Sequence, residues 1–173
     1  MPSFAATLDP VAIDDLVARL RAFQAVGAEQ AQRSPAAPPA VAPPLPLGPV
    51  PLNPGGPQPV GFQVQPATTP CDVVKAQLDR GARMALLDAR APSDFVNEHI
   101  AGAVSVPFYD PKPYFASLPK DVWYVCYCAC PHAESGQLAH RLVEAGFKKV
   151  TVLDEGLGVW HSRGYPVRSG MDP

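Results

Sequence analysis

The sequence predicts an α/β domain built on a parallel β-sheet and preceded by two segments of a different kind. From Thr69 onward, short continuous apolar runs alternate with stretches of helical periodicity, which is typical of a parallel sheet covered on both faces. Residues 35–70 hold 13 prolines, which cannot donate to helix or sheet hydrogen bonds. Residues 9–32 place apolar side chains at helical spacing. The chain therefore divides into three parts.

The first part, residues 1–33, is predicted to contain an amphipathic helix over 9–32. Asp9 suits the N-cap and Pro10 the first helical position. The apolar face would pack on the downstream domain or on a second copy of the chain, or would dock on a separate protein partner or a membrane surface. Its members are Ile13, Leu16, Val17, Leu20 and Phe23.

The second part, residues 34–69, is predicted to be a semi-extended polyproline linker. No Asp, Glu, Lys or Arg lies between Arg33 and Asp72. Such a segment cannot build a core, although its apolar residues could lie against one. The missing flanking cations disfavour a role as a ligand for an SH3-like domain.

The third part is a globular domain over residues 70–168, followed by a C-terminal tail at 169–173. The pair Thr69-Pro70 is a helix-start signal, and the apolar stripe after it ends at Gly81. The strand at 121–128 is the strongest because it is rich in β-branched and aromatic residues. The remaining predicted elements are strand 84–87, helix 92–97, strand 103–106, helix 138–145 with its start near Ser135, strand 150–153 and helix 156–162.

Charge and cysteine usage exclude several classes of function. The net charge of −2 gives no basic footprint for nucleic acid or an anionic membrane, and no apolar run reaches the roughly 18 residues needed to span a bilayer. Four cysteines, three of them within five positions, favour site chemistry over a disulfide scaffold. Early acidic residues argue against a secretory signal. We expect a cytoplasmic protein, unless a leader was removed before residue 1.

The end of the strand 121–128 carries the candidate reactive group, Cys128. Ligands of parallel α/β sheets bind beyond the carboxyl ends of strands, where helix N-termini present free N–H groups. Those groups and the positive helix end favour the reactive thiolate over the thiol. We expect Cys128 to face the loop, to be open to small molecules and to act as a nucleophile. Cys126 is expected to be a buried core residue.

Several stretches of residues 70–168 resemble the rhodanese-like family of sulfurtransferases, in the right order and spacing. The resemblance implies a five-stranded parallel sheet flanked by helices, with Cys128 as the residue that carries sulfur. The matching stretches are 86–90 (LLDAR), 95–103 (FVNEHIAGA), 125–128 (VCYC), 145–147 (AGF), 153–160 (LDEGLGVW) and 164–167 (GYPV).

Such enzymes take sulfane sulfur from thiosulfate or a persulfide, hold it as a cysteine persulfide and pass it to a thiol or cyanide. This chemistry needs no cofactor. Asp88 and Arg90 are expected to be a supporting ion pair, His99 a hydrogen-bonded turn anchor, and Trp160 core or pocket wall. The expected substrate-binding residues are Ala129, Cys130, His132, Ala133, Glu134 and Ser135.

The loop after Cys128 departs from the family pattern. It reaches the first helical Ser in seven steps rather than six, the loop size of phosphatases and arsenate reductases of the same fold. Those enzymes need an arginine six residues after the cysteine to clamp an oxyanion, but Glu134 stands here, so we expect neither activity.

Residues 129–135 hold no Lys or Arg, and only His132 could add positive charge. We therefore expect weak use of thiosulfate, a dianion, and a preference for thiol persulfides. Alternatively, Glu134 is only a first-turn carboxylate that interacts favourably with the helix dipole.

Cys130 leaves other readings of the loop open. It could relay sulfur, form a strained and easily reduced disulfide with Cys128, or be a passive thiol. The alternative function is a non-catalytic interaction or redox-sensing module that uses Cys128 and Cys130. A metal site at Cys126, Cys128, Cys130 and His132 is disfavoured, because alternate strand residues lie about 6.6 Å apart whereas zinc ligands are spaced within turns.

Overall fold

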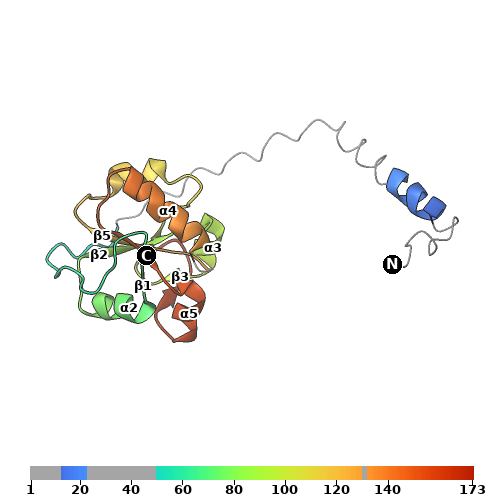
Figure 1. Cartoon of the computed structure of the whole chain (residues 1–173). Coiled ribbons are helices and arrows are strands. Elements are labelled where there is room, and N and C mark those ends of the chain that lie inside the picture. The colour runs from blue at the N-terminus through green and yellow to red at the C-terminus, as the bar shows by residue number, and fades with distance from the viewer. Residues whose placement is uncertain (1–12, 23–49, 130–131) are drawn as a thin grey trace, which may run out of the picture. The chain divides into compact units, whose positions relative to one another are not determined.

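The computed structural model describes residues 13–22, 50–129 and 132–173. It divides into two units, residues 1–43 and 44–173. In the first unit, residues 13–22 form a helix (Figure 1), and Asp15 and Arg19 make an ion pair along it. The predicted helix is therefore present over its middle. Its predicted cap, the remainder of 9–32 and residues 34–49 of the predicted linker lie outside the described residues.

The second unit contains a five-stranded parallel sheet with helices on both faces, which confirms the predicted fold class. The strand order is β1-β6-β5-β2-β4, and every neighbouring pair is parallel. The strands are β1 (Thr68–Thr69), β2 (Met84–Asp88), β4 (Ala103–Ser105), β5 (Trp123–Tyr127) and β6 (Val150–Leu153). The helices are α2 (Cys71–Asp79), α3 (Pro92–Asn97), the 3-10 helix η2 (Lys112–Ser117), α4 (Ala133–Glu144) and α5 (Gly156–Ser162).

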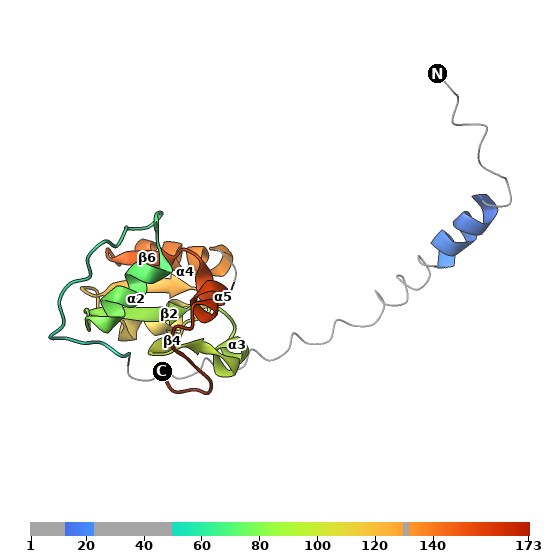
Figure 2. The same cartoon turned by 90° about the horizontal axis from the view of Figure 1, so that it is seen from below.

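The helices divide between the two faces of the sheet. In Figure 1, α4 lies on one side of the strands and α2 and α5 on the other. Figure 2 looks onto the second side, with α2 and α5 in front of the strands. No helix in the described part of the chain is both long and apolar enough to cross a membrane.

The central strands send alternate side chains into two apolar cores, because successive residues of a strand point to opposite faces. Leu87 and Cys126 belong to the core under α4. Leu86 and Val125 belong to the opposite core, together with Trp160 of α5. Burial of β2 over its whole length fits a sheet covered on both faces. Cys126 and Trp160 are thus core residues, as predicted.

The start of the domain differs from the prediction. Thr69 does not cap a helix but lies in β1, where it pairs with Leu153 of β6 and its hydroxyl lies 2.7 Å from that of Thr151. Helix α2 begins at Cys71, and the Glu155 carboxylate accepts its backbone N–H at 2.7 Å. A two-residue strand is too short to show any periodicity, so the sequence pattern missed it.

Residues 50–67, which we assigned to the linker, lie against the domain. Val50 and Leu52 pack on the core under α4, and the ring of Phe62 meets that of Trp123 edge-on with centroids 5.3 Å apart. The packed region therefore begins before the predicted boundary at residue 70. The apolar residues of this segment pack against a core that other elements form.

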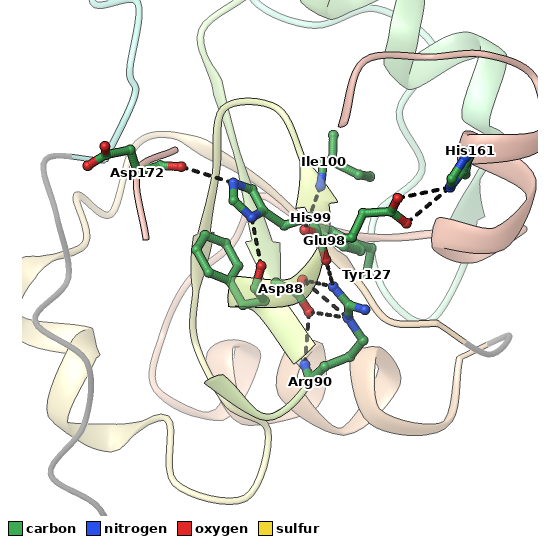
Figure 3. A network of polar contacts seen from close by, with 9 residues as sticks. Asp88, Arg90, Glu98, His99, Ile100, Tyr127, His161 and Asp172 are labelled. Carbon is green, nitrogen blue, oxygen red and sulfur yellow. Dashed lines mark hydrogen bonds and ion pairs between the residues drawn. The ribbon is translucent and has the colours of Figure 1, made fainter. Parts of the chain in front are cut away.

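A second, two-stranded sheet was not predicted. Strands β3 (His99–Ile100) and β7 (Val167–Arg168) pair antiparallel beside the main sheet. His99 is buried, and its ring nitrogens lie 2.8 Å from the Phe95 carbonyl oxygen and 3.0 Å from that of Asp172 (Figure 3). His99 is hydrogen-bonded as expected, but it sits in a strand and holds the C-terminal tail.

Candidate functional site

Cys128 lies directly beyond β5, which ends at Tyr127 rather than at Cys128 as predicted. Its carbonyl oxygen accepts a hydrogen bond of 2.9 Å from the Leu157 N–H of α5. Its side chain belongs to the apolar cluster that also contains Leu138 and Ala139 of α4. This places the thiol at the carboxyl edge of the sheet, on the face that α4 covers.

The expectation that Cys128 is open to solvent is wrong for this structure, because the residue has 0% exposure. Helix α4 begins at Ala133, two residues earlier than predicted, so Ser135 lies inside its first turn. Ser135 is itself only 1% exposed, and its Oγ lies 3.3 Å from the Sγ of Cys128. The helix that should activate the thiol therefore also covers it.

The contact with Ser135 places the sulfur at the positive end of α4. The first N–H groups of a helix have no partner within the helix, and the helix dipole favours negative charge there. A serine hydroxyl can accept a hydrogen bond from a thiol or donate one to a thiolate. The Ser135 hydroxyl can therefore hydrogen-bond to the Cys128 sulfur in either protonation state.

The side chain of His132 ties the start of α4 to the residue after β6. Its Nε2 lies 2.7 Å from the carbonyl oxygen of Asp154 and 3.0 Å from the Asp154 Oδ1. Asp154 is held in turn by the Thr68 hydroxyl at 2.9 Å. The backbone of His132 is left-handed, with φ of 65°, which is uncommon for a residue other than glycine. The only cation candidate of the loop is therefore directed at a carboxylate.

Glu134 lies in the first turn of α4 in a field that disfavours its charge. Burial raises the pKa of this carboxyl, the charges of Asp94 and Asp88 raise it further, and Arg90 partly opposes them. Asp94 comes from the first turn of α3. Asp94 was not among the predicted site residues, although its place just after a predicted helix start at this edge was a signal.

On the other face of the same edge, Asp88 and Arg90 form the expected ion pair (Figure 3). The guanidinium Nε and Nη2 donate to the Asp88 carboxylate at 2.9 and 2.6 Å, and Nη2 also donates to the Glu98 carbonyl oxygen at 2.6 Å. Burial alone would lower the pKa of Arg90. The hydrogen bonds to Asp88 and the negative charge of Asp88 outweigh the effect of burial, so the pKa of Arg90 is raised. The pair holds the loop after β2 to the chain before β3.

Tyr127 extends this network across the strands. It lies opposite Asp88 in the β2–β5 register, and its hydroxyl accepts the Ile100 N–H at 3.1 Å. Burial, and next the Asp88 charge, raise the pKa of the phenol well above its usual value. Tyr127 therefore stays a neutral structural group.

Of the remaining predicted site residues, Ala129 and Ala133 are exposed, and Cys130 lies outside the described residues. A surface hollow of about 550 Å³ runs along α4 and is lined in part by His132 and Ala133. Across residues 13–22, 50–129 and 132–173, no three His, Cys, Asp or Glu side chains gather closely enough to hold a metal ion.

Comparison with known proteins identifies the same fold. The model of the rhodanese-like domain matches residues 71–163, which is more than half of the chain. The rhodanese-like domain of the Alr3790 protein from Anabaena is 30% identical with a TM-score of 0.56, over 60% of this chain and 93% of that one. A thiosulfate sulfurtransferase from Pseudomonas aeruginosa is 26% identical with a TM-score of 0.56, over 61% of this chain and 21% of that one.

The relatives found by sequence are named for different functions, or for none. An uncharacterized protein of Synechocystis is 32% identical over 52% of this chain, and an HTH-type transcriptional regulator of Mycobacterium tuberculosis is 28% identical over 57%. The chain spans about half of each of these two relatives, 50% and 45%. The thiosulfate sulfurtransferase GlpE of Stutzerimonas stutzeri is 29% identical over 50% of this chain and 78% of its own length. By the match of the family model, the chain belongs to the rhodanese-like domain family.

Proposed function

We propose that the domain is a sulfurtransferase that carries sulfane sulfur as a persulfide on Cys128. The observation that carries the proposal is the position of the thiol beyond β5, 3.3 Å from the Ser135 hydroxyl in the first turn of α4. Membership of the family supports sulfur transfer, and two relatives are named as thiosulfate sulfurtransferases. The acceptor is a thiol or cyanide.

The reaction consists of two displacements at the same sulfur. The Cys128 thiolate attacks the outer sulfur of a donor persulfide, the donor S–S bond breaks, and its electron pair leaves with the donor thiolate. An acceptor thiolate then attacks the outer sulfur of the Cys128 persulfide, and the electron pair of that bond returns to Cys128. No net oxidation occurs, and the covalent intermediate gives ping-pong kinetics.

Burial of Cys128 adds a condition to this mechanism. Because the residue has 0% exposure, a donor reaches Sγ only when the groups that cover it move. Ser135 is one of those groups, since it is 1% exposed and in contact with the sulfur. Transfer therefore requires the first turn of α4 and the end of β5 to separate transiently, as local opening of a fold allows.

The charges around the thiol favour thiol persulfides over thiosulfate as donors. The sequence from 129 to 135 contains no Lys or Arg, and His132 is directed at Asp154. Glu134 brings a carboxylate into the first turn of α4, and a nearby negative charge repels a dianion. The kcat/KM for a small thiol persulfide should exceed that for thiosulfate, and a higher value for thiosulfate would reject this preference.

A second candidate is a non-catalytic interaction or redox-sensing module that uses Cys128 and Cys130. The complete burial of Cys128 favours it, because a module that only docks or senses does not need rapid access to small donors. One relative of similar sequence is named as a transcriptional regulator rather than as an enzyme. In this case Cys128 would change state slowly, through a disulfide.

Intact-mass spectrometry after incubation with a thiol persulfide separates the two candidates. Transfer predicts a gain of about 32 Da, one sulfur atom, that is absent in Cys128→Ser and present in Cys126→Ala. Cys126→Ala is the matched control because Cys126 has the same 0% exposure and lies on the same face of β5. A loss of only about 2 Da that needs both Cys128 and Cys130 supports the redox module and rejects the enzyme.

A further inference from the structure

One side chain, that of His132, connects the start of α4 to the chain beyond β6. His132 is the N-cap residue of α4 but makes no capping hydrogen bond with its ring. Instead, Nε2 lies 2.7 Å from the carbonyl oxygen of Asp154 and 3.0 Å from its Oδ1. Because a carbonyl oxygen only accepts hydrogen bonds, Nε2 carries a proton and donates it.

The Asp154 end of this contact is fixed to the sheet. The Asp154 N–H donates to the Thr69 carbonyl oxygen at 3.0 Å. The Thr68 hydroxyl donates at 2.9 Å to Oδ1, the same carboxylate oxygen that His132 contacts. Thr68 and Thr69 form β1, which pairs with β6. Asp154 therefore belongs to the part of the fold that stays in place when α4 moves.

The backbone of Cys128 is held on the same side. Its carbonyl oxygen accepts the Leu157 N–H of α5 at 2.9 Å. Ser135, which is 1% exposed and lies 3.3 Å from the sulfur, is carried by the first turn of α4. The sulfur therefore becomes accessible when that turn moves away, and the N-cap His132 moves with it. This movement has to break the contact between His132 and Asp154.

The backbone of His132 makes this contact more important. Its φ is 65°, and within the described part of the chain it is the only residue other than glycine with a positive φ. A backbone of this kind persists only where surrounding contacts support it. The hydrogen bonds to Asp154 are such a support, so the start of α4 is held less firmly without them.

We propose that His132 and Asp154 are positioning residues whose contact sets how often the first turn of α4 uncovers the sulfur of Cys128. The contact thereby sets the rate at which Cys128 is loaded with sulfur. The statement on loading rests on the proposed function, whereas the statement on access to the sulfur does not. The two residues act through the position of α4 and leave the displacement at sulfur unchanged.

Iodoacetamide labelling of native protein that carries Cys130→Ser measures access to the sulfur. His132→Gly removes the ring but keeps the left-handed backbone, which glycine adopts without strain. It should raise the labelling rate of Cys128 about fivefold, because labelling follows the population of the open form. Asp154→Ala should raise it only about twofold, since the backbone carbonyl still accepts. The double variant should label no faster than His132→Gly alone, because both changes remove one contact.

His161→Ala is the matched control. The ring of His161 in α5 also pairs with a carboxylate, that of Glu98 at 3.1 Å, but this pair is not broken when α4 moves. The variant should leave the labelling rate of Cys128 within about twofold of wild type, even where it lowers global stability. Labelling of Cys126 reports that global stability in every variant. Unchanged labelling of Cys128 in His132→Gly overturns the inference, and so does an equal rise in His161→Ala.

The rate of sulfur loading separates the inference from the proposed function. In stopped-flow mixing with a thiol persulfide, His132→Gly should load Cys128 about fivefold faster than wild type. His132→Gln keeps an N–H donor and should return the rate toward that of wild type. Loading of His132→Gly at the wild-type rate overturns the inference alone. Faster labelling with no sulfur on Cys128 in any variant supports the role of the contact in access and rejects the proposed function.

Discussion

The carboxyl edge of the sheet presents two buried groups on opposite faces, and they are built in different ways. On one face, Asp88 and Arg90 neutralise each other through three hydrogen bonds from guanidinium to carboxylate. On the other face, the Cys128 sulfur meets the neutral Ser135 hydroxyl at 3.3 Å. The first arrangement fixes one charge state. The second accommodates a thiol, a thiolate or a persulfide without leaving an opposite charge unpaired.

Under the proposed function, burial alone does not separate structural from reactive groups. Asp88 and Cys128 both have 0% exposure, yet removal of a partner has different consequences for each. A buried carboxylate that loses its cation retains an expensive charge. A sulfur that loses a hydroxyl neighbour loses only one weak hydrogen bond.

The largest effect is expected on the Asp88 face. Arg90→Met leaves the Asp88 carboxylate buried without its cation, which should cost about 3–5 kcal/mol of unfolding free energy. Urea unfolding followed by far-UV circular dichroism measures the loss. The Asp88→Asn/Arg90→Met double variant should be more stable than the sum of the single changes predicts, because no lone charge remains. A loss below about 1 kcal/mol in Arg90→Met would show that the pair behaves as a surface salt bridge.

A smaller effect is expected on the Cys128 face. Ser135→Ala should slow the loading of sulfur on Cys128 about tenfold, which corresponds to one hydrogen bond of about 1.4 kcal/mol. Stopped-flow mixing with a thiol persulfide gives this rate, and Ser135→Thr should restore most of it because the hydroxyl is kept. Ser162→Ala is the control, since that hydroxyl only donates to the Val159 carbonyl oxygen on the exposed side of α5. If Ser135→Ala loads as fast as Ser162→Ala, the hydroxyl does not assist the sulfur.

The smallest effect is expected at Glu134, where the two faces meet. Because the pKa of Glu134 is raised in the fold, the stability from its protonated form is lost as the pH rises through that pKa. The free energy of unfolding of Glu134→Gln at pH 7 should therefore exceed that of wild type by at most about 0.5 kcal/mol. The gain should disappear below the ordinary glutamate pKa of about 4.3. Urea titrations at pH 4 and pH 7 measure this gain. A variant that is less stable than wild type at pH 7 would contradict a surrounding field that disfavours the charge of Glu134.

The elements with strong local signals were predictable from the sequence. Helix α3, strand β6 and helix α5 have the predicted bounds, because Pro92 starts α3 and turn residues bracket the other two. Strands β1, β3 and β7 were missed, since two residues carry no period. The 3-10 helix η2 was also missed. Their existence depends on partners distant in the chain, which a local pattern does not contain.

The site was predictable in outline only. The place of Cys128 followed from the strand before it and the helix after it, and Asp88 and Arg90 were identified through the family resemblance. The burial of Cys128 depends on how α4 docks. The turn of His132 toward Asp154 joins residues 22 positions apart. Neither is visible in a local pattern.

The proposed function requires the sulfur of Cys128 to become accessible in the folded protein, unlike the other buried thiols. Burial raises the pKa of Cys126, and burial together with Glu155 raises that of Cys71 to about 12, so both should stay unreactive. The direct measurement is iodoacetamide labelling of the native Cys130→Ser protein at pH 7.5, followed by peptide mass spectrometry. We expect Cys128 to be alkylated at least about a hundredfold faster than Cys126 and Cys71. Alkylation of all three at the common slow rate of global unfolding would contradict it.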